Sequence, residues 1–222
     1  MKKEKHKVVA ASRLNQILQR RSTVLLLLGL VCIIGLPLRI QNMKLNGYIS
    51  DDAWWHYRQI EEVVEFGHRL NPDIHEFTTL NRPMTYQPLF HYTVGFAYKI
   101  FGKGLSLVEF TNYFNILEAV RYILLIYGLS YLISGNRLFS IIGALAVSVS
   151  YGMIIRARAG ELMPFVLGDL FAFGSVLLLL KLLKDVTQQN SPWLCLISGI
   201  FMGLSLLAWN GGIYIYLPLV LF

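Results

Sequence analysis

Apolar residues fall into long uninterrupted blocks along the chain, separated by shorter polar segments. A helix needs roughly 20 residues, at 1.5 Å each, to cross a hydrocarbon core, and five blocks are about that long. A sixth block begins but is cut short. The pattern therefore predicts an all-α polytopic membrane helix bundle of about five full spans plus a truncated sixth. The predicted spans are Val24–Leu38, Ile116–Ile133, Leu138–Ile155, Leu162–Leu180, Pro192–Trp209 and the partial Gly211–Phe222.

The first and last blocks raise the question of processing. The first follows a basic head, residues 1–21, and resembles a secretory signal, but Leu36-Pro37-Leu38-Arg39 lacks the small residues of a cleavage site. An uncleaved membrane segment is therefore favoured. The last block would end inside a helix, with backbone polar groups poorly placed in lipid. We therefore expect the sequence to be a fragment of a longer protein, and the isolated fragment to be inactive.

Composition excludes an ordinary water-soluble domain, because 55% of the 222 residues are hydrophobic and only 15% are charged. The net charge of +7 comes mostly from residues predicted to lie inside the cell. It therefore indicates an anionic cytoplasmic leaflet as neighbour, and no nucleic acid as partner. Cys32 and Cys195 both lie in apolar spans, where small core residues are more usual than a disulfide or a metal pair.

Positive charge also predicts the orientation of the bundle, since short cytoplasmic loops hold Lys and Arg. The basic head places the N-terminus in the cytoplasm, and counting spans then places residues 42–109 and residues 156–161 outside the cell. Arg156 and Arg158 do not fit that rule, so we expect them to serve something other than topology. The chain is predicted to be a multi-pass integral protein of the plasma membrane with an extracytoplasmic site.

The long outer segment, residues 42–109, has the pattern of two helices lying on the membrane surface. Asp51 and Asp52 can cap the first helix and Gly67 can end it, while its Trp and Tyr residues favour the headgroup layer. The second, Pro88–Phe101, is apolar and aromatic but too short to span. Both are predicted to be interfacial.

Four short stretches carry a family resemblance. Asp52-Ala-Trp-Trp-His-Tyr-Arg58 is similar to the start of the first external loop in oligosaccharyltransferase catalytic subunits, and Tyr86-Gln-Pro-Leu-Phe-His-Tyr92 to a later part of that loop in archaeal members. Arg156-Ala-Arg-Ala-Gly160 is similar to the start of their second external loop, and Leu207-Ala-Trp-Asn-Gly-Gly212 to their Trp-x-Gly-Gly turn. They keep the family's order, and all four lie on one predicted side of the membrane.

The resemblance implies the GT-C fold of membrane glycosyltransferases and a polyprenyl-phosphate- or diphosphate-linked glycan donor. It also implies a divalent cation, Mn²⁺ or Mg²⁺, between carboxylates of the first two external loops, and an acceptor polypeptide that receives the glycan on asparagine. A hard cation on oxygen ligands suits a diphosphate leaving group. Asp52 is the predicted metal ligand and catalytic carboxylate, although capping of a helix would explain it as well.

The second acidic position departs from the family pattern. Where the family has an acidic pair, this chain has Met163 and Phe165, which cannot ligate a hard ion. Glu161 is the nearest replacement and is predicted to be the second catalytic and metal-binding carboxylate. The alternative is that this member has lost metal-dependent catalysis.

Other polar residues are candidates for the site or for structural pairs. Arg58, Arg156 and Arg158 are predicted to grip the donor phosphates, since guanidinium offers paired hydrogen bonds; lipid headgroups are the alternative. His91, Tyr92 and Trp209 are possible site-lining residues. The outer histidines, His68, His75 and His91, match no standard zinc spacing.

Three ionisable residues are predicted to lie within the spans. Glu118 and Arg121 should form an ion pair. Asp169 lies eight residues beyond Glu161, about 12 Å further along the helix, where a charge is expensive. It is expected to pair with Arg121 or to bond a serine or tyrosine.

Three functions remain open. The first is en bloc transfer of an oligosaccharide to protein asparagine, which is favoured. The second is transfer of a single sugar of the mannosyl or aminoarabinosyl type, and the third is a non-catalytic membrane homologue.

Overall fold

The computed structural model describes residues 20–70, 86–184 and 191–221. Every regular element in these ranges is a helix, which agrees with the predicted all-α class. The helices are α2 (Arg21–Gly35), α3 (Pro37–Ile40), α4 (Asp51–Phe66), α5 (Leu89–Phe101), α6 (Leu107–Ser134), α7 (Arg137–Val149), α8 (Tyr151–Arg156), α9 (Phe165–Lys184), α10 (Ser191–Ala208), the 3₁₀ turn η1 (Asn210–Gly212) and α11 (Ile213–Leu221).

Three of the described helical segments are long and apolar enough to cross a membrane: Arg21–Ile40, Leu107–Ser134 and Phe165–Lys184. Two shorter apolar helices, Arg137–Val149 and Pro192–Ala208, lie beside them. The apolar blocks thus form helices where the sequence predicted them. The number that span a bilayer remains a prediction.

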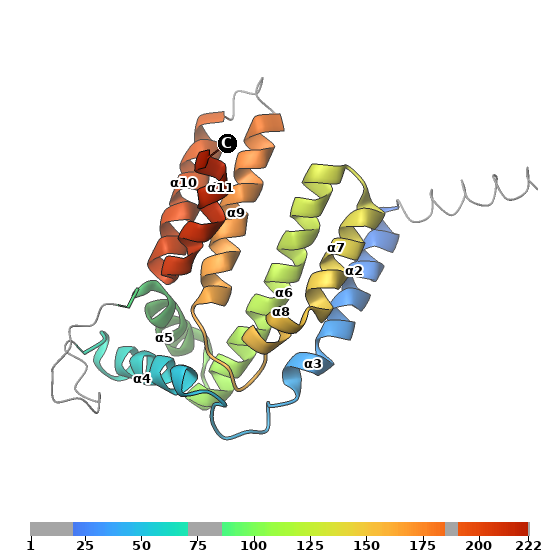
Figure 1. The fold of residues 1–222 in the computed structure, drawn as a ribbon. Coiled ribbons are helices and arrows are strands. Elements are labelled where there is room, and N and C mark those ends of the chain that lie inside the picture. Colours follow the sequence, from blue (N-terminus) through green and yellow to red (C-terminus); the bar gives the residue numbers. More distant parts are fainter. Residues whose placement is uncertain (1–19, 71–85, 185–190, 222) are drawn as a thin grey trace, which may run out of the picture.

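Figure 1 shows how these helices are arranged. α2 packs on α7, α7 on α6, α6 on α9 and α9 on α10, so the apolar helices form one continuous row. α4 and α5 lie against each other at the lower end of that row, where the loop after α8 also lies. The two predicted external loops therefore share one end of the bundle.

Two predicted spans are interrupted. In the first, Pro37 begins the short α3, because proline suits the first turn of a helix but not its interior. In the third, Ser150 has extended backbone between α7 and α8. The buried Arg39 donates to the carbonyls of Gly35, at 2.9 Å, and Ser148, at 2.8 Å. It thereby satisfies groups at the C-terminal ends of α2 and α7 that lack helical partners.

Two other helices begin at different residues from those predicted. α6 starts at Leu107, well before Ile116, because Ser106 and Glu109 form a capping box. α9 starts at Phe165 and not at Leu162, since Gly160 has a φ of +81° and the chain is still turning there. The second outer loop is consequently longer than predicted, and the first ends earlier.

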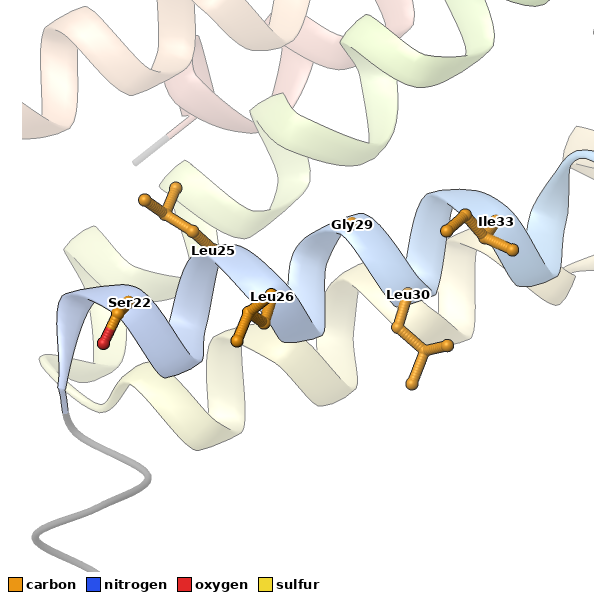
Figure 2. A pocket seen from close by; sticks show the side chains of 6 residues that line it. All are labelled: Ser22, Leu25, Leu26, Gly29, Leu30 and Ile33. Atoms are coloured by element: carbon orange, nitrogen blue, oxygen red, sulfur yellow. The ribbon is translucent and has the colours of Figure 1, made fainter.

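The outward face of α2 bears a shallow apolar groove around Gly29, shown in Figure 2. Leu25 and Leu26 on this face are 69% and 75% exposed. Such a surface is expected on a helix that faces lipid, because hydrocarbon solvates it as well as a protein core would. The groove is lined by Ser22, Leu25, Leu26, Gly29, Leu30 and Ile33.

Candidate functional site

Two hydrogen bonds join the two loops that the sequence predicts to be external, called the first and second outer loops below. The Ser50 hydroxyl donates to the Glu161 carboxylate at 2.9 Å, and the Ile49 N–H donates to the Gly160 carbonyl at 2.8 Å. Ser50 is also the N-cap of α4 and accepts from the Ala53 N–H at 3.3 Å. The bond between Ser50 and Glu161 therefore places the first turn of α4 directly beside the second loop.

Asp51 and Asp52 occupy that first turn, and both are exposed. Burial of the Tyr86 phenol raises its pKa, and the nearby Asp52 carboxylate raises it further. Asp52 therefore faces the segment around Tyr86. The expectation that Asp51 or Asp52 caps α4 is wrong, because the N-cap is Ser50. Asp52 lies in the first turn, where the helix dipole favours negative charge.

Glu161 is nearly buried, with 6% of its surface exposed, and both carboxylate oxygens are engaged. One accepts from Ser50, and the other forms an ion pair with Arg158 at 3.2 Å. Each oxygen keeps a second lone pair. Arg158 is thus held beside Glu161, with 29% of its side chain exposed. The end of the bundle where the two outer loops meet is called the rim below.

The remaining arginines differ in their surroundings. The exposed Arg156 guanidinium lies 4.6 Å from the ring centre of Phe165. Phe165 in turn meets Trp209 edge to face at 5.8 Å. Stacking on an aromatic face holds a guanidinium in place while its edges stay free to bond. Arg58 is half-buried on α4.

A third outer segment, the turn after α10, reaches the same rim. The Gln87 side-chain amide donates to the side-chain oxygen Oδ1 of Asn210, which joins the end of the first loop to the residue after Trp209. Trp209 itself is half-buried. Three outer segments therefore meet at one end of the bundle.

His91 has no exposed surface, and its ring centre lies 6.4 Å from that of Tyr86. Its ring nitrogens contact His56 at 2.8 Å and Arg69 at 3.2 Å, between α4 and α5. Burial, followed by the Arg69 charge, lowers the pKa of His56 to about 3, and burial chiefly lowers that of His91. Tyr92 accepts from the Arg69 N–H at 3.4 Å. The sequence did not single out His56 and Arg69, because their contacts with His91 arise only when α4 packs on α5.

The ion pair of Glu118 and Arg121 is confirmed. Arg121 is thereby engaged with Glu118, and the cation acting on Asp169 is Arg156, which lies beside both Asp169 and Tyr122. Asp169 lies on the first turns of α9, the end of that helix next to the loop that carries Glu161.

Metal ligands are few in the part of the chain that the structure describes. No three His, Cys, Asp or Glu side chains gather there in a way that could hold an ion, and His75 lies outside the described residues. Mg²⁺ usually takes only one or two carboxylates and completes its shell with water and substrate phosphate. The exposed Asp52 fits that role directly. Glu161 fits it only through its second lone pairs, because Arg158 already neutralises its charge.

No protein-family model matches the chain. A curated relative does: "Dolichyl-phosphooligosaccharide-protein glycotransferase 2" of Archaeoglobus fulgidus is 28% identical over 200 residues, which cover 87% of this chain and 32% of that protein. The chain resembles the N-terminal part of archaeal oligosaccharyltransferases. It therefore spans about a third of the length of this curated relative.

Solved structures of the Archaeoglobus fulgidus oligosaccharyltransferase share the fold. The apo form has a TM-score of 0.78 at 20% identity, covering 91% of this chain and 25% of that chain. The archaeal oligosaccharyltransferase AglB in complex with an inhibitory peptide and a dolichol-phosphate has a TM-score of 0.74 at 21% identity, covering 89% and 25%. The helical fold of the described residues thus resembles part of the fold of these proteins.

Proposed function

We propose that this chain is the donor-binding part of a glycosyltransferase that moves an oligosaccharide from a polyprenyl phosphate or diphosphate to protein asparagine. The observation that carries the proposal is the bond between Ser50 and Glu161, which brings an exposed carboxylate and two arginines to one rim. The archaeal relative supports the reaction class by its name. Solved structures of the Archaeoglobus fulgidus oligosaccharyltransferase were obtained with a dolichol-phosphate and with an acceptor peptide containing the NVT sequon.

The donor phosphate is bound by Arg156 and Arg158 in this proposal. Arg156 is exposed and stacked, so its outer N–H groups are free to bond a phosphate in a bidentate manner. Arg158 has donors beyond the one it gives to Glu161. Arg58 lies further along α4, six residues after Asp52, and is a third candidate.

Asp52 would hold a divalent cation, Mn²⁺ or Mg²⁺, at this rim. A bound cation would stabilise the negative charge that develops on the leaving phosphate. A zinc and sulfate complex of the Archaeoglobus enzyme supports a metal in this fold. Glu161 would join as second ligand only by sharing its carboxylate with Arg158, so Asp52 is the principal ligand.

The acceptor asparagine needs help from the same carboxylate, because an amide nitrogen is a poor nucleophile. A carboxylate that accepts hydrogen bonds from the amide N–H groups can orient that nitrogen. The exposed Asp52 can do this, whereas the buried Glu161 acts mainly by holding Arg158. Tyr92 and Trp209 are proposed to border the rim, and His91 to support it from within. No observation favours the single-sugar alternative.

Asp51 and Asp52 offer a matched pair for the test, since they are adjacent, exposed and in the same helical turn. Transfer of glycan to an Asn-Val-Thr peptide is measured in membranes of cells producing the gene product that carries these residues. Asp52→Asn should lower transfer by about 10²-fold or more, and Asp51→Asn by only a few-fold at most, at equal protein level. Equal effects of the two changes would overturn the assignment of Asp52, and no transfer by the parent would overturn the function.

A further inference from the structure

Three polar side chains on α6 contact both outer loops. Thr111, Asn112 and Asn115 have exposed fractions of 0%, 1% and 2%. Positions three and four apart share a helix face, so the three form one buried polar stripe beneath the rim. Buried polar groups of this kind are retained where their hydrogen bonds are made.

Asn115 holds the second loop through its backbone. Its side-chain amide donates to the carbonyl of Arg158 at 2.9 Å and to that of Glu161 at 3.0 Å. These carbonyls are the two ends of a turn, in which the Glu161 N–H donates to the Arg158 carbonyl at 3.3 Å. One carboxamide thus fixes the backbone from which both members of the ion pair project.

The neighbouring residues of the stripe extend this support to the first loop. Asn112 accepts from the Gly160 N–H at 2.8 Å, and the Gly160 carbonyl accepts from Ile49 at 2.8 Å. The Thr111 hydroxyl bonds the Tyr48 hydroxyl at 2.5 Å. Both loops are therefore held by two adjacent turns of one rigid helix.

We propose that Asn115 is a positioning residue, which sets Arg158 and Glu161 against the first turn of α4 for donor binding and transfer. This inference rests on the proposed function for its consequence, but not for its geometry. Both bonds require an N–H donor, so Asn115→Asp would set a carboxylate oxygen against two carbonyl oxygens. The turn would then shift, although no group touching the donor had changed.

A distance measurement tests the geometry without any need for activity. In the full chain, Cys32 and Cys195 are replaced by serine, and Asp51 and Met163 are replaced by cysteine and spin-labelled. The distribution of distances between the two labels is then recorded in lipid nanodiscs. Asn115→Asp and Asn115→Ala should broaden or shift the distribution. Ser175→Ala is the matched control, because Ser175 is equally buried and loses a bond to Ser198 between α9 and α10, away from the rim.

Transfer kinetics, measured without labels in the gene product that carries these residues, test the consequence. Loss of positioning should lower kcat by roughly 10- to 100-fold while the KM for acceptor peptide stays unchanged, and Ser175→Ala should leave kcat near the parent value. If Asn115→Asp fails to accumulate, Asn115→Ala provides the test, since it introduces no charge.

The outcomes separate the two proposals. An unchanged distance distribution in the Asn115 variants overturns the positioning role, and so does a broadened one with normal kcat. A broadened distribution in a protein whose parent transfers nothing supports the geometry and overturns the proposed function. Equal broadening by Ser175→Ala would show a general loosening and overturn the specific role of Asn115.

Discussion

Single residues decide how the second outer loop turns, and Gly160 is the clearest case. Its φ of +81° lies in the left-handed region, which L side chains rarely adopt. A Cβ there would also lie 3.1 Å from the Ile49 side chain and 3.3 Å from that of Asn42. Glycine at this position thus permits both the turn and its contact with the first loop.

Replacing Gly160 by alanine should therefore destabilise the loop by about 1–2 kcal/mol through backbone strain alone. Gly152→Ala is the control, because Gly152 is helical and nothing lies within 4 Å of its added Cβ. It should be neutral or slightly stabilising. Hydrogen exchange of residues 157–161 measures the difference, and equal protection in the two variants would contradict the strain argument.

The sequence predicted which residues lie at the rim better than it predicted what each of them contacts. The sequence pointed to Asp52, Arg156, Arg158 and Glu161, and the structure brings their segments to one end of the bundle. It did not reveal that Glu161 is already engaged by Ser50 and Arg158, because both contacts depend on how the loops fold. The role of Asn115 could not be predicted either, since an asparagine before an apolar run is usually a solvated residue.

At the scale of elements, α4 and α5 form one unit joined through buried histidines. His56 and His91 contact each other, and Gly95 allows α5 to approach Val63 of α4 closely. Both imidazoles are kept neutral by burial, and the Arg69 charge adds to this effect. Protonating either would place a second cation beside Arg69 in a dry interface.

This arrangement predicts acid sensitivity. The folded pKa of His56 is about 3, below the ordinary 6.5, so only the unfolded chain gains protons as pH falls from 6.5 toward 3. The contribution of the pair to stability is therefore complete above pH 6.5 and declines below it. Between pH 7 and pH 5 the α4–α5 unit should lose about 2 kcal/mol through His56 alone, and a further loss through His91.

Hydrogen exchange of residues 51–66 across this pH range measures the loss. His56→Asn, which cannot titrate, should remove about half of the pH dependence. His68→Asn should not, because His68 is exposed. A pH dependence that is the same in all three proteins would show that the buried pair is not its source.

The boundaries of the elements show what a sequence pattern can and cannot locate. The capping signal of α6 was present as Ser106 and Glu109, so its early start could have been predicted. The break at Ser150 could not, because it depends on Arg39 reaching from another helix to the Ser148 carbonyl. Apolar length predicts where a helix lies, but contacts between helices decide where it is interrupted.

At the scale of the whole molecule, the two ends of the bundle differ. The rim formed by the three outer segments lies at one end, and the bond from Lys184 to the Leu132 carbonyl joins α9 to α6 at the other. Such a bundle can present a polar rim to a lipid-linked donor while its apolar faces contact lipid. The central claim is that Asp52 at this rim binds a cation together with the donor phosphate.

Binding of Mn²⁺ to the chain in lipid nanodiscs, followed by electron paramagnetic resonance with and without dolichyl phosphate, tests that claim most directly. The account predicts bound Mn²⁺ that increases with dolichyl phosphate, is retained in Asp51→Asn and is lost in Asp52→Asn. Binding that is absent from the parent protein, or that is equal in Asp52→Asn and Asp51→Asn, would contradict it.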